Sequence, residues 1–186
     1  MKIKNVETFD IEGLKVIEPA VFGDDRGYFL ETFNEADLLS IGITTHFVQD
    51  NESSSSRNVL RGLHYQVGKP QAKLVRVISG TVYDVAVDLR KDSPTFGQWQ
   101  GVLLSGENKK MFFIPRGFAH GFCVVSEKAV FAYKCDNFWY PEGERGVLFS
   151  DPDLNINWGD YIDLNKVILS EKDKLHPTLS EAKFDE

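Results

Sequence analysis

From Val59 onward the chain is a succession of short strand-like runs with turn signals between them. The runs are VLRGLHYQ, AKLVRVIS, GTVYDVAVDLR, GQWQGVLLS, KMFFIP, GFCVVS, AVFAYKCDNFW and GVLFS. Many short strands at close spacing are typical of an antiparallel sandwich or barrel. This feature restricts the chain to an all-β fold.

The earlier part of the chain predicts more strands and one short helix. Residues 1–33 have strand character, with a turn at GDDRG before YFLETF. Asn34 is placed to cap a helix over EADLLSI, which Gly42 ends. NESSSSRN is polar throughout, so we expect residues 51–58 to form a loop lying over a site. A helical segment is expected near the C-terminus, with Ser170 as its cap.

Length and charge limit the classes of function. The 186 residues fit one domain over 1–186 with an ample core. The net charge of −7 argues against a nucleic-acid-binding protein, because phosphate backbones require a basic face. A small anionic ligand remains compatible with this charge, since local Arg and Lys can outweigh the global sign.

The N-terminal sequence and the cysteines indicate a compartment. MKIKNVETFD lacks the apolar core of a signal peptide, and no apolar run approaches the roughly 20 residues of a membrane span. Cys123 and Cys135 have no CxxC spacing and lie in apolar runs, so we expect two reduced core thiols. The sequence predicts a cytoplasmic protein that does not bind membranes.

Period-2 alternation sorts the strand side chains by face. In the first central strand it separates one set, Leu60, Gly62, His64 and Gln66, from another, Arg61, Leu63 and Tyr65. In later strands Lys73 shares a face with Val75 and Val77, and Tyr133 shares one with Phe131 and Cys135.

Ionisable side chains inside apolar strands are costly unless they have partners or a function. Taken singly, each of His64, Lys73, Asp84 and Tyr133 is more often a structural residue. Four such groups in consecutive strands indicate a site in which a base and a cation share a pocket.

A second pattern indicates the type of barrel. PRGFAH at 115–120 is a PxGxxH motif, and it accompanies Gly62, His64, Gln66, Lys73 and Gly80. Together they resemble the two-part signature of the cupin superfamily, whose fold is a jelly-roll β-barrel. Metal-binding cupins carry a second His and a Glu where this chain has Gln66 and Lys73. An ammonium repels a cation, so the pocket is predicted to bind no metal.

Longer runs resemble the dTDP-4-dehydrorhamnose 3,5-epimerase family. They are VFGDDRGYFLETF, FVQDN, NVLRGLHYQ, KLVRVISGTVYDVAVDLRKDSPTFGQW and IPRGFAHGF, and the similarity extends from about Ile17 to Asp173. The resemblance implies a jelly-roll homodimer without a cofactor. Its substrate would be a dTDP-linked 4-keto-6-deoxyhexose, epimerised at C3 and C5 in dTDP-L-rhamnose synthesis.

The resemblance also implies residue roles. His64 would be the general base, Asp173 its orienting carboxylate, Tyr133 the acid, and Lys73 the cation beside the C4 ketone oxygen. The positions matching family contacts to nucleotide, diphosphate and sugar are Arg26, Glu31, Gln49, Asp50, Asn51, Arg61, Lys73, His120, Glu144 and Lys172. From the residues alone, we add the hypothesis that Asp84 orients His120.

Two details conflict with a simple version of this site. Alternation puts Arg61 on the face opposite His64, so either the strand twists at Gly62 or Arg61 acts at a dimer interface. Phe138 stands where relatives often carry Tyr, which preserves stacking on a thymine base but removes a hydroxyl contact.

Three other functions remain open at this point. They are epimerisation at C3 only or of a related nucleotide-linked ketosugar, sugar binding without catalysis, and metal-dependent cupin chemistry.

Overall fold

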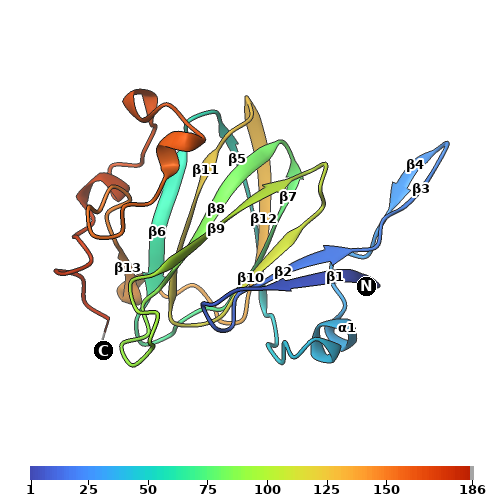
Figure 1. The fold of residues 1–186 in the computed structure, drawn as a ribbon, viewed down its shortest axis with the longest axis horizontal. Helices are drawn as coiled ribbons and strands as arrows, with labels where there is room; N and C mark the ends of the chain where they lie inside the picture. The colour runs from blue at the N-terminus through green and yellow to red at the C-terminus, as the bar shows by residue number, and fades with distance from the viewer. Residues whose placement is uncertain (185–186) are drawn as a thin grey trace.

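The computed structural model of this protein describes residues 1–184 and is a barrel of two facing antiparallel sheets (Figure 1). The first sheet has the strand order β1-β2-β10-β7-β12-β5, and the second has the order β13-β6-β11-β8-β9. Apart from β1–β2 and β8–β9, neighbouring strands are not consecutive in sequence, as in a jelly roll. The all-β jelly-roll prediction is confirmed.

The strands of the first sheet are β1 (Ile3–Thr8), β2 (Lys15–Pro19), β10 (Met111–Ile114), β7 (Lys73–Ser79), β12 (Lys128–Cys135) and β5 (Gln49–Ser56). Those of the second are β13 (Glu144–Gly146), β6 (Leu60–Gln66), β11 (Phe118–Val124), β8 (Thr81–Asp88) and β9 (Trp99–Ser105). Apolar side chains from both sheets fill the space between them, among them Val75, Phe112, Phe122 and Phe131.

A two-stranded arm, β3 (Phe22–Asp24) and β4 (Gly27–Phe29), projects from the barrel (Figure 1). Its aromatic side chains are exposed, Phe22 to 56% and Phe29 to 65%. The helix α1 (Glu35–Ser40) follows the arm, and the Asn34 side chain accepts hydrogen bonds from the N–H groups of Ala36 and Asp37. The predicted helix and its cap are confirmed.

The segment predicted to be a loop at 51–58 is mostly strand β5, so that prediction was wrong. β5 pairs with β12 along its whole length, from Gln49 opposite Cys135 to Ser56 opposite Lys128. It lies at the end of its sheet. A strand with one face on solvent and the other on a polar cavity does not need apolar residues, and hydropathy therefore did not reveal it.

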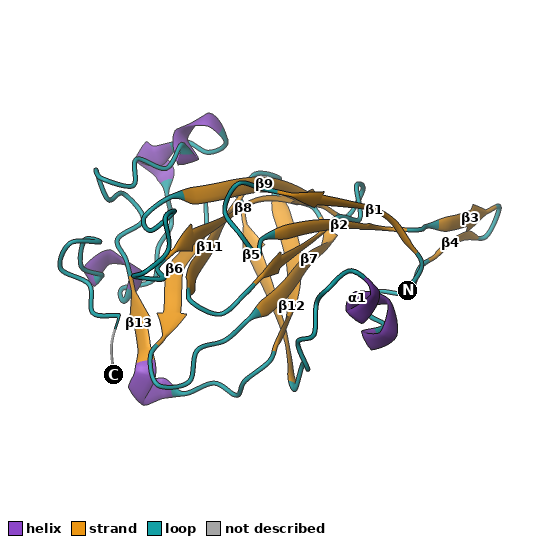
Figure 2. Ribbon diagram, turned by 60° about the horizontal axis from the view of Figure 1, so that its bottom comes forward, coloured by secondary structure: helices purple, strands orange, loops and turns teal. Residues whose placement is uncertain are grey.

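The C-terminal segment is helical only as short 3₁₀ turns, η2 (Trp158–Asp160), η3 (Leu164–Lys166) and η4 (Asp173–Leu175), besides the earlier η1 (Pro141–Gly143). Figure 2 shows these turns beside β6 and β13. Trp158 and Ile162 pack with Leu63 on the outer face of the second sheet. These anchors hold the chain to the sheet surface, so an extended α-helix does not form. Ser170 does accept a hydrogen bond from the Asp173 N–H.

Two predictions drawn from composition can be compared with this fold. Cys123 and Cys135 are buried free thiols, as expected. In the part of the chain described, no helix is long and apolar enough to cross a membrane.

Candidate active site

A cavity of ≈ 530 Å³ lies between the two sheets. The second sheet contributes His64 and Arg61 from β6 and His120 from β11, whereas the first contributes Lys73 from β7 and Tyr133 from β12. An adjoining cavity of ≈ 460 Å³ shares Asn51, His64, Lys73 and Tyr133 with it. The four ionisable groups singled out in the sequence therefore meet in or beside one space.

His64 and Asp173 form a hydrogen-bonded pair across 109 residues of sequence. Their atoms Nε2 and Oδ1 are 2.6 Å apart, and Asp173 is 3% exposed. Burial acts to raise the pKa of Asp173, but the hydrogen bond and charge of His64 outweigh it and hold that pKa below its usual range. The ionised carboxylate accepts a hydrogen bond from the Nε2–H of His64, and this leaves Nδ1 of His64 as the basic nitrogen.

A second histidine–carboxylate pair lies beside the first. His120 is opposite His64 in the β11–β6 ladder. Its Nε2 is 2.9 and 3.0 Å from the two carboxylate oxygens of Asp84, which is fully buried. Burial lowers the pKa of His120 despite the carboxylate, so the ring is neutral near pH 7. The contact expected between Asp84 and His120 is present.

Lys73 enters the cavity from β7 on the same face as Val75 and Val77, as alternation predicts. Burial lowers the pKa of its ammonium, although Cys135 and Asp84 act in the opposite direction. Within residues 1–184, no ion pair or hydrogen bond is found for this ammonium. A buried cation without a partner favours an anionic or carbonyl oxygen as ligand.

Tyr133 faces His64 from the other sheet. It lies on β12, opposite Val75 of the neighbouring strand β7. Burial raises the pKa of its phenol, so Tyr133 keeps its proton at neutral pH. The site thus combines an imidazole on one wall with a protonated phenol on the other.

Arg61 lines the same cavity as His64, so simple alternation was wrong at this strand. Gly62 has φ +119, and the β11–β6 register shifts nearby. This irregularity turns Leu60 to the outer cluster with Leu63 and brings Arg61 inward, where its Nε donates to Ser55 Oγ at 3.1 Å. Of the two alternatives, the strand twist at Gly62 is the one observed.

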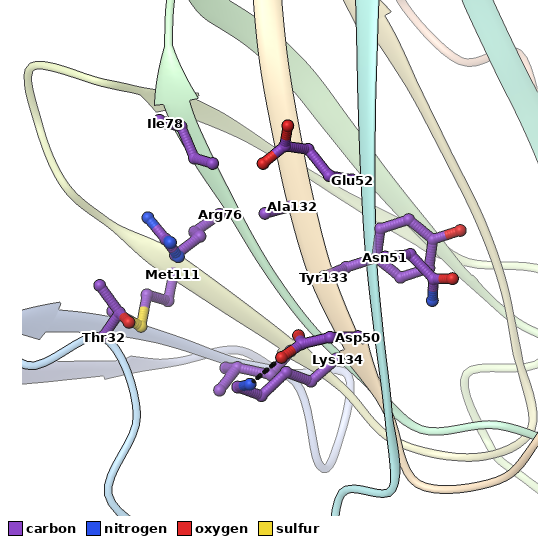
Figure 3. A pocket seen from close by; sticks show the side chains of 11 residues that line it. Thr32, Asp50, Asn51, Glu52, Arg76, Ile78, Met111, Ala132, Tyr133 and Lys134 are labelled. Atoms are coloured by element: carbon purple, nitrogen blue, oxygen red, sulfur yellow. Dashed lines mark hydrogen bonds and ion pairs between the residues drawn. The ribbon is translucent and has the colours of Figure 1, made fainter.

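The residues of β5 that were predicted to contact the substrate lie on two faces of the strand. Gln49 and Asn51 line the cavity next to His64. Figure 3 shows Asn51 and Tyr133 on one side of β5 and β12, and Asp50 with Lys134 on the other. The Asp50 carboxylate is 2.6 Å from Lys134 Nζ. The Asp50 carboxylate is thus paired with Lys134, and Asp50 also contributes to the lining of the ≈ 530 Å³ cavity that contains His64.

The rim carries charged and aromatic groups. Glu144 lines the outer cavity and pairs with Lys172 at 2.6 Å. Burial acts to raise the pKa of Glu144, but Lys172 more than offsets it, so the carboxylate is ionised. Trp139 also lines this cavity and is 61% exposed, while Phe138 beside it is 65% exposed. Both rings are accessible for stacking with a planar ligand.

Comparisons with known proteins agree with this site geometry. A family model described as dTDP-4-dehydrorhamnose 3,5-epimerase matches residues 8–181. The chain belongs to this epimerase family. The dTDP-4-dehydrorhamnose 3,5-epimerase of Methanothermobacter thermautotrophicus is 54% identical to it over 164 residues, 88% of each chain.

Solved structures of family members superpose closely on the fold. The dTDP-6-deoxy-D-glucose-3,5-epimerase of Legionella pneumophila, in complex with dTDP-4-keto-L-rhamnose, has 50% identity and a TM-score of 0.91, covering 96% of this chain and 94% of its own. A 3'-monoepimerase from Streptomyces bikiniensis, in complex with dTDP-quinovose, has 34% identity and a TM-score of 0.85, with 94% and 87% covered.

Two of the contacts expected for the epimerase family lie outside the cavity of their own chain. Arg26 is on the projecting arm, with its side chain 90% exposed and paired to Asp24. Glu31 pairs with the N-terminal ammonium of Met1 at 2.5 Å. Neither residue contributes to the His64 cavity within one copy of the chain.

The sequence analysis did not single out His176, which the structure places beside the His64–Asp173 pair. His176 lies 3.2 Å from the Asp173 carboxylate, on the oxygen that also contacts His64. Its spacing of three residues from Asp173 was the only available signal, and a single such spacing is weak. The polar atoms of these three side chains lie within 4.8 Å of one another.

Proposed function

We propose that this chain inverts C3 and C5 of dTDP-4-dehydro-6-deoxy-D-glucose to give dTDP-4-dehydro-L-rhamnose. Membership of the epimerase family supports this reaction. The observation that carries the residue assignment is the placement of His64 and Tyr133 on opposite walls of one cavity. Inversion needs proton removal from one face of a carbon and proton return to the other.

His64 is the general base in this proposal. The carbon next to a ketone loses its proton most readily to a base with a matched pKa. Asp173 holds the Nε2–H of His64, fixes the tautomer, and stabilises the imidazolium formed after proton removal. The Nδ1 lone pair is then the proton acceptor.

Lys73 stabilises the enolate. Removing the proton places negative charge on the C4 oxygen, and a preorganised cation there is usually the largest electrostatic contribution. The buried ammonium of Lys73 is suited to this because, in the described chain, it has no carboxylate neutralising it. His120, held by Asp84, would contact the sugar from the adjacent strand.

Tyr133 returns the proton from the opposite side. Its raised pKa keeps the phenol protonated until the enolate is ready to accept the proton. The same base and acid serve C3 and C5 in turn. Between the two steps the sugar ring shifts, His64 gives its proton to water, and Tyr133 takes a proton back from water. In this proposal, side chains of the protein carry every proton transfer at the sugar.

The nucleotide is assigned to the outer cavity and its rim. Gln49, Asn51, Glu144 and Trp139 line this space and suit a base and a ribose. Arg61 in the inner cavity and Lys172 at the rim are the cations within reach of a diphosphate.

We also propose a homodimer in which the arm of one copy completes the site of the other. The exposed Phe22, Tyr28 and Phe29 support a surface covered in the dimer. Arg26 and Glu31 would then reach the partner's nucleotide, which accounts for their distance from their own cavity.

Mixed dimers test this arrangement. An Arg26→Ala chain and a His64→Ala chain, mixed by unfolding and refolding together, form heterodimers with one intact site each. Random pairing predicts a return to about a quarter of the wild-type activity. Activity equal to the sum of the two unmixed variants would contradict arm exchange.

We propose further that residues 1–186 act as one domain in the cytoplasm; residues 185 and 186 lie outside the described part of that range. The product would serve dTDP-L-rhamnose synthesis.

Exchange in heavy water tests the reaction itself. Incubation with dTDP-4-dehydro-6-deoxy-D-glucose in heavy water should place deuterium at both C3 and C5, as read by NMR on the ketosugar. Deuterium at C3 alone would identify a monoepimerase, and no incorporation would contradict epimerisation.

A further inference from the structure

We propose that His176 is a positioning residue for the epimerisation: its imidazole N–H holds the Asp173 carboxylate and limits how strongly that carboxylate stabilises protonated His64. This inference rests on the proposed role of His64 as the base. It adds a second imidazole to the histidine–aspartate pair.

The contacts place His176 on the same oxygen that His64 uses. Asp173 Oδ1 is 2.6 Å from His64 Nε2 and 3.2 Å from His176 Nε2. The two rings meet edge to face, with centroids 5.5 Å apart and planes at 83°. The side chains of His176 and Asp173 are 7% and 4% exposed. One buried carboxylate oxygen is thus shared by two imidazoles.

The backbone leaves a defined place for the His176 ring. Gly146 on β13 lies opposite His64 in the β13–β6 ladder, and a Cβ added there would overlap the His176 ring. The carbonyl of Pro177 accepts a hydrogen bond from the Leu148 N–H at 2.8 Å and fixes the chain just after His176. The His176 ring therefore occupies a position that requires glycine at residue 146, because a side chain there would overlap the ring.

Both imidazoles act as N–H donors to Asp173. The carboxylate is ionised, so each Nε2 that contacts it carries a proton and has no lone pair directed at a metal. Burial lowers the pKa of His176, and the charge of protonated His64 lowers it further, whereas Asp173 opposes both. His176 is therefore neutral near pH 7.

A neutral donor on Oδ1 reduces the negative charge that His64 experiences. Without it, Asp173 would stabilise the imidazolium more strongly, and the pKa of His64 would rise. The other charged or titratable groups that line the cavities beside His64 or pair with their lining are Lys73, Tyr133, Cys135, Asp50 and Glu52 on the facing sheet, Arg61 and Tyr65 on its own strand, His120 with Asp84 on the adjacent strands, and Glu144 with Lys172 at the rim. A change confined to His176 leaves all of them in place.

Two substitutions separate the hydrogen bond from the packing. His176→Phe keeps a ring and removes the donor, whereas His176→Gln retains an N–H donor. His176→Phe should raise the NMR-measured pKa of His64 by about half to one unit, equivalent to the net value of one hydrogen bond. The acid limb of kcat/KM should move to higher pH by the same amount in His176→Phe. In His176→Gln, which keeps a donor, both the pKa of His64 and the acid limb should lie close to their wild-type values.

His46 provides a matched control. It forms an exposed pair with Glu35, 2.9 Å from Nδ1 to the carboxylate, away from the cavity. His46→Phe should leave both the pKa of His64 and the pH profile unchanged. Gly146→Ala keeps the chemistry of His176 but displaces its ring, so it should reproduce the shift caused by His176→Phe.

Distinct results would overturn this inference. If the His176→Phe protein has a lower Tm but an unchanged acid limb and an unchanged His64 pKa, His176 is only structural. If that variant does not fold, the Gly146→Ala profile decides by the same criterion. A His64→Ala protein with near-normal turnover would instead refute the base assignment, independently of His176.

Discussion

His64 and Tyr133 face one cavity from opposite sheets of the barrel, His64 on β6 and Tyr133 on β12. A sugar ring between them would present one face to an imidazole and the other to a phenol. The pairing of the two sheets, more than either residue alone, gives this protein the geometry for inversion at carbon.

Replacing His64 by Ala should remove the base and leave nucleotide binding in place. General acid–base steps contribute about 100- to 10,000-fold, so kcat should fall by at least about 100-fold. Turnover by NMR and dTDP binding by calorimetry check the two parts separately. Loss of binding together with turnover would show that His64 is needed for more than proton removal.

Tyr133→Phe should uncouple exchange from inversion. His64 can still remove a proton and return deuterium from the same face, so exchange into the substrate in heavy water should continue. Inverted product should decrease by about 100-fold or more because the acid on the opposite wall is gone. NMR of the ketosugar distinguishes retained from inverted deuterated carbon. Equal loss of exchange and inversion would contradict the assignment of Tyr133 as acid only.

Lys73 should set the basic limb of the pH profile. Burial lowers the pKa of the Lys73 ammonium below its usual range and raises the pKa of the Tyr133 phenol. Activity that needs the ammonium should therefore fall at a pH below the ordinary lysine range. The Lys73→Arg enzyme should be slower than wild type. Its basic limb should lie at higher pH, because the guanidinium stays charged over that range. An unchanged limb would assign it to another group.

Asp88, which does not line the active-site cavities, should make the stability of the fold decrease at low pH. Its fully buried carboxylate accepts hydrogen bonds from Arg90, Ser93 and Thr95. Burial acts to raise its pKa, but these bonds outweigh burial and lower the pKa from 3.8 to about 2. Because the folded-state pKa is the lower one, the stabilisation is complete above about pH 4 and is lost as pH falls toward 2.

The size of that effect is measurable by urea unfolding. A decrease of roughly two pKa units corresponds to about 2.5 kcal/mol of unfolding free energy. Asp88→Asn should be less stable than wild type near neutral pH and should lose less stability between pH 4 and 2. The same acid dependence in both proteins would exclude Asp88 as its source.

The predictable parts of the fold are those with local patterns. Alternating apolar residues around Val75 and Val77 identified a half-buried strand, and Asn34 with Gly42 bounded the helix. The polar strand β5 was missed because its inner face lines a cavity, where hydropathy no longer reports burial. The C-terminal helix was overestimated because side chains such as Trp158 bind the sheet and set the path of the chain.

The sequence by itself determined the strand-rich fold, the chemical types in the site, and the family, since these depend on patterns and runs of neighbouring residues. Only the tertiary structure decided which side chains meet. The turn at Gly62 brought Arg61 inward, the topology set His64 against Tyr133, and the C-terminal segment carried Asp173 and His176 to His64. The His64–Asp173 contact joins residues 109 positions apart, and no local interaction fixes a distance over that length of chain.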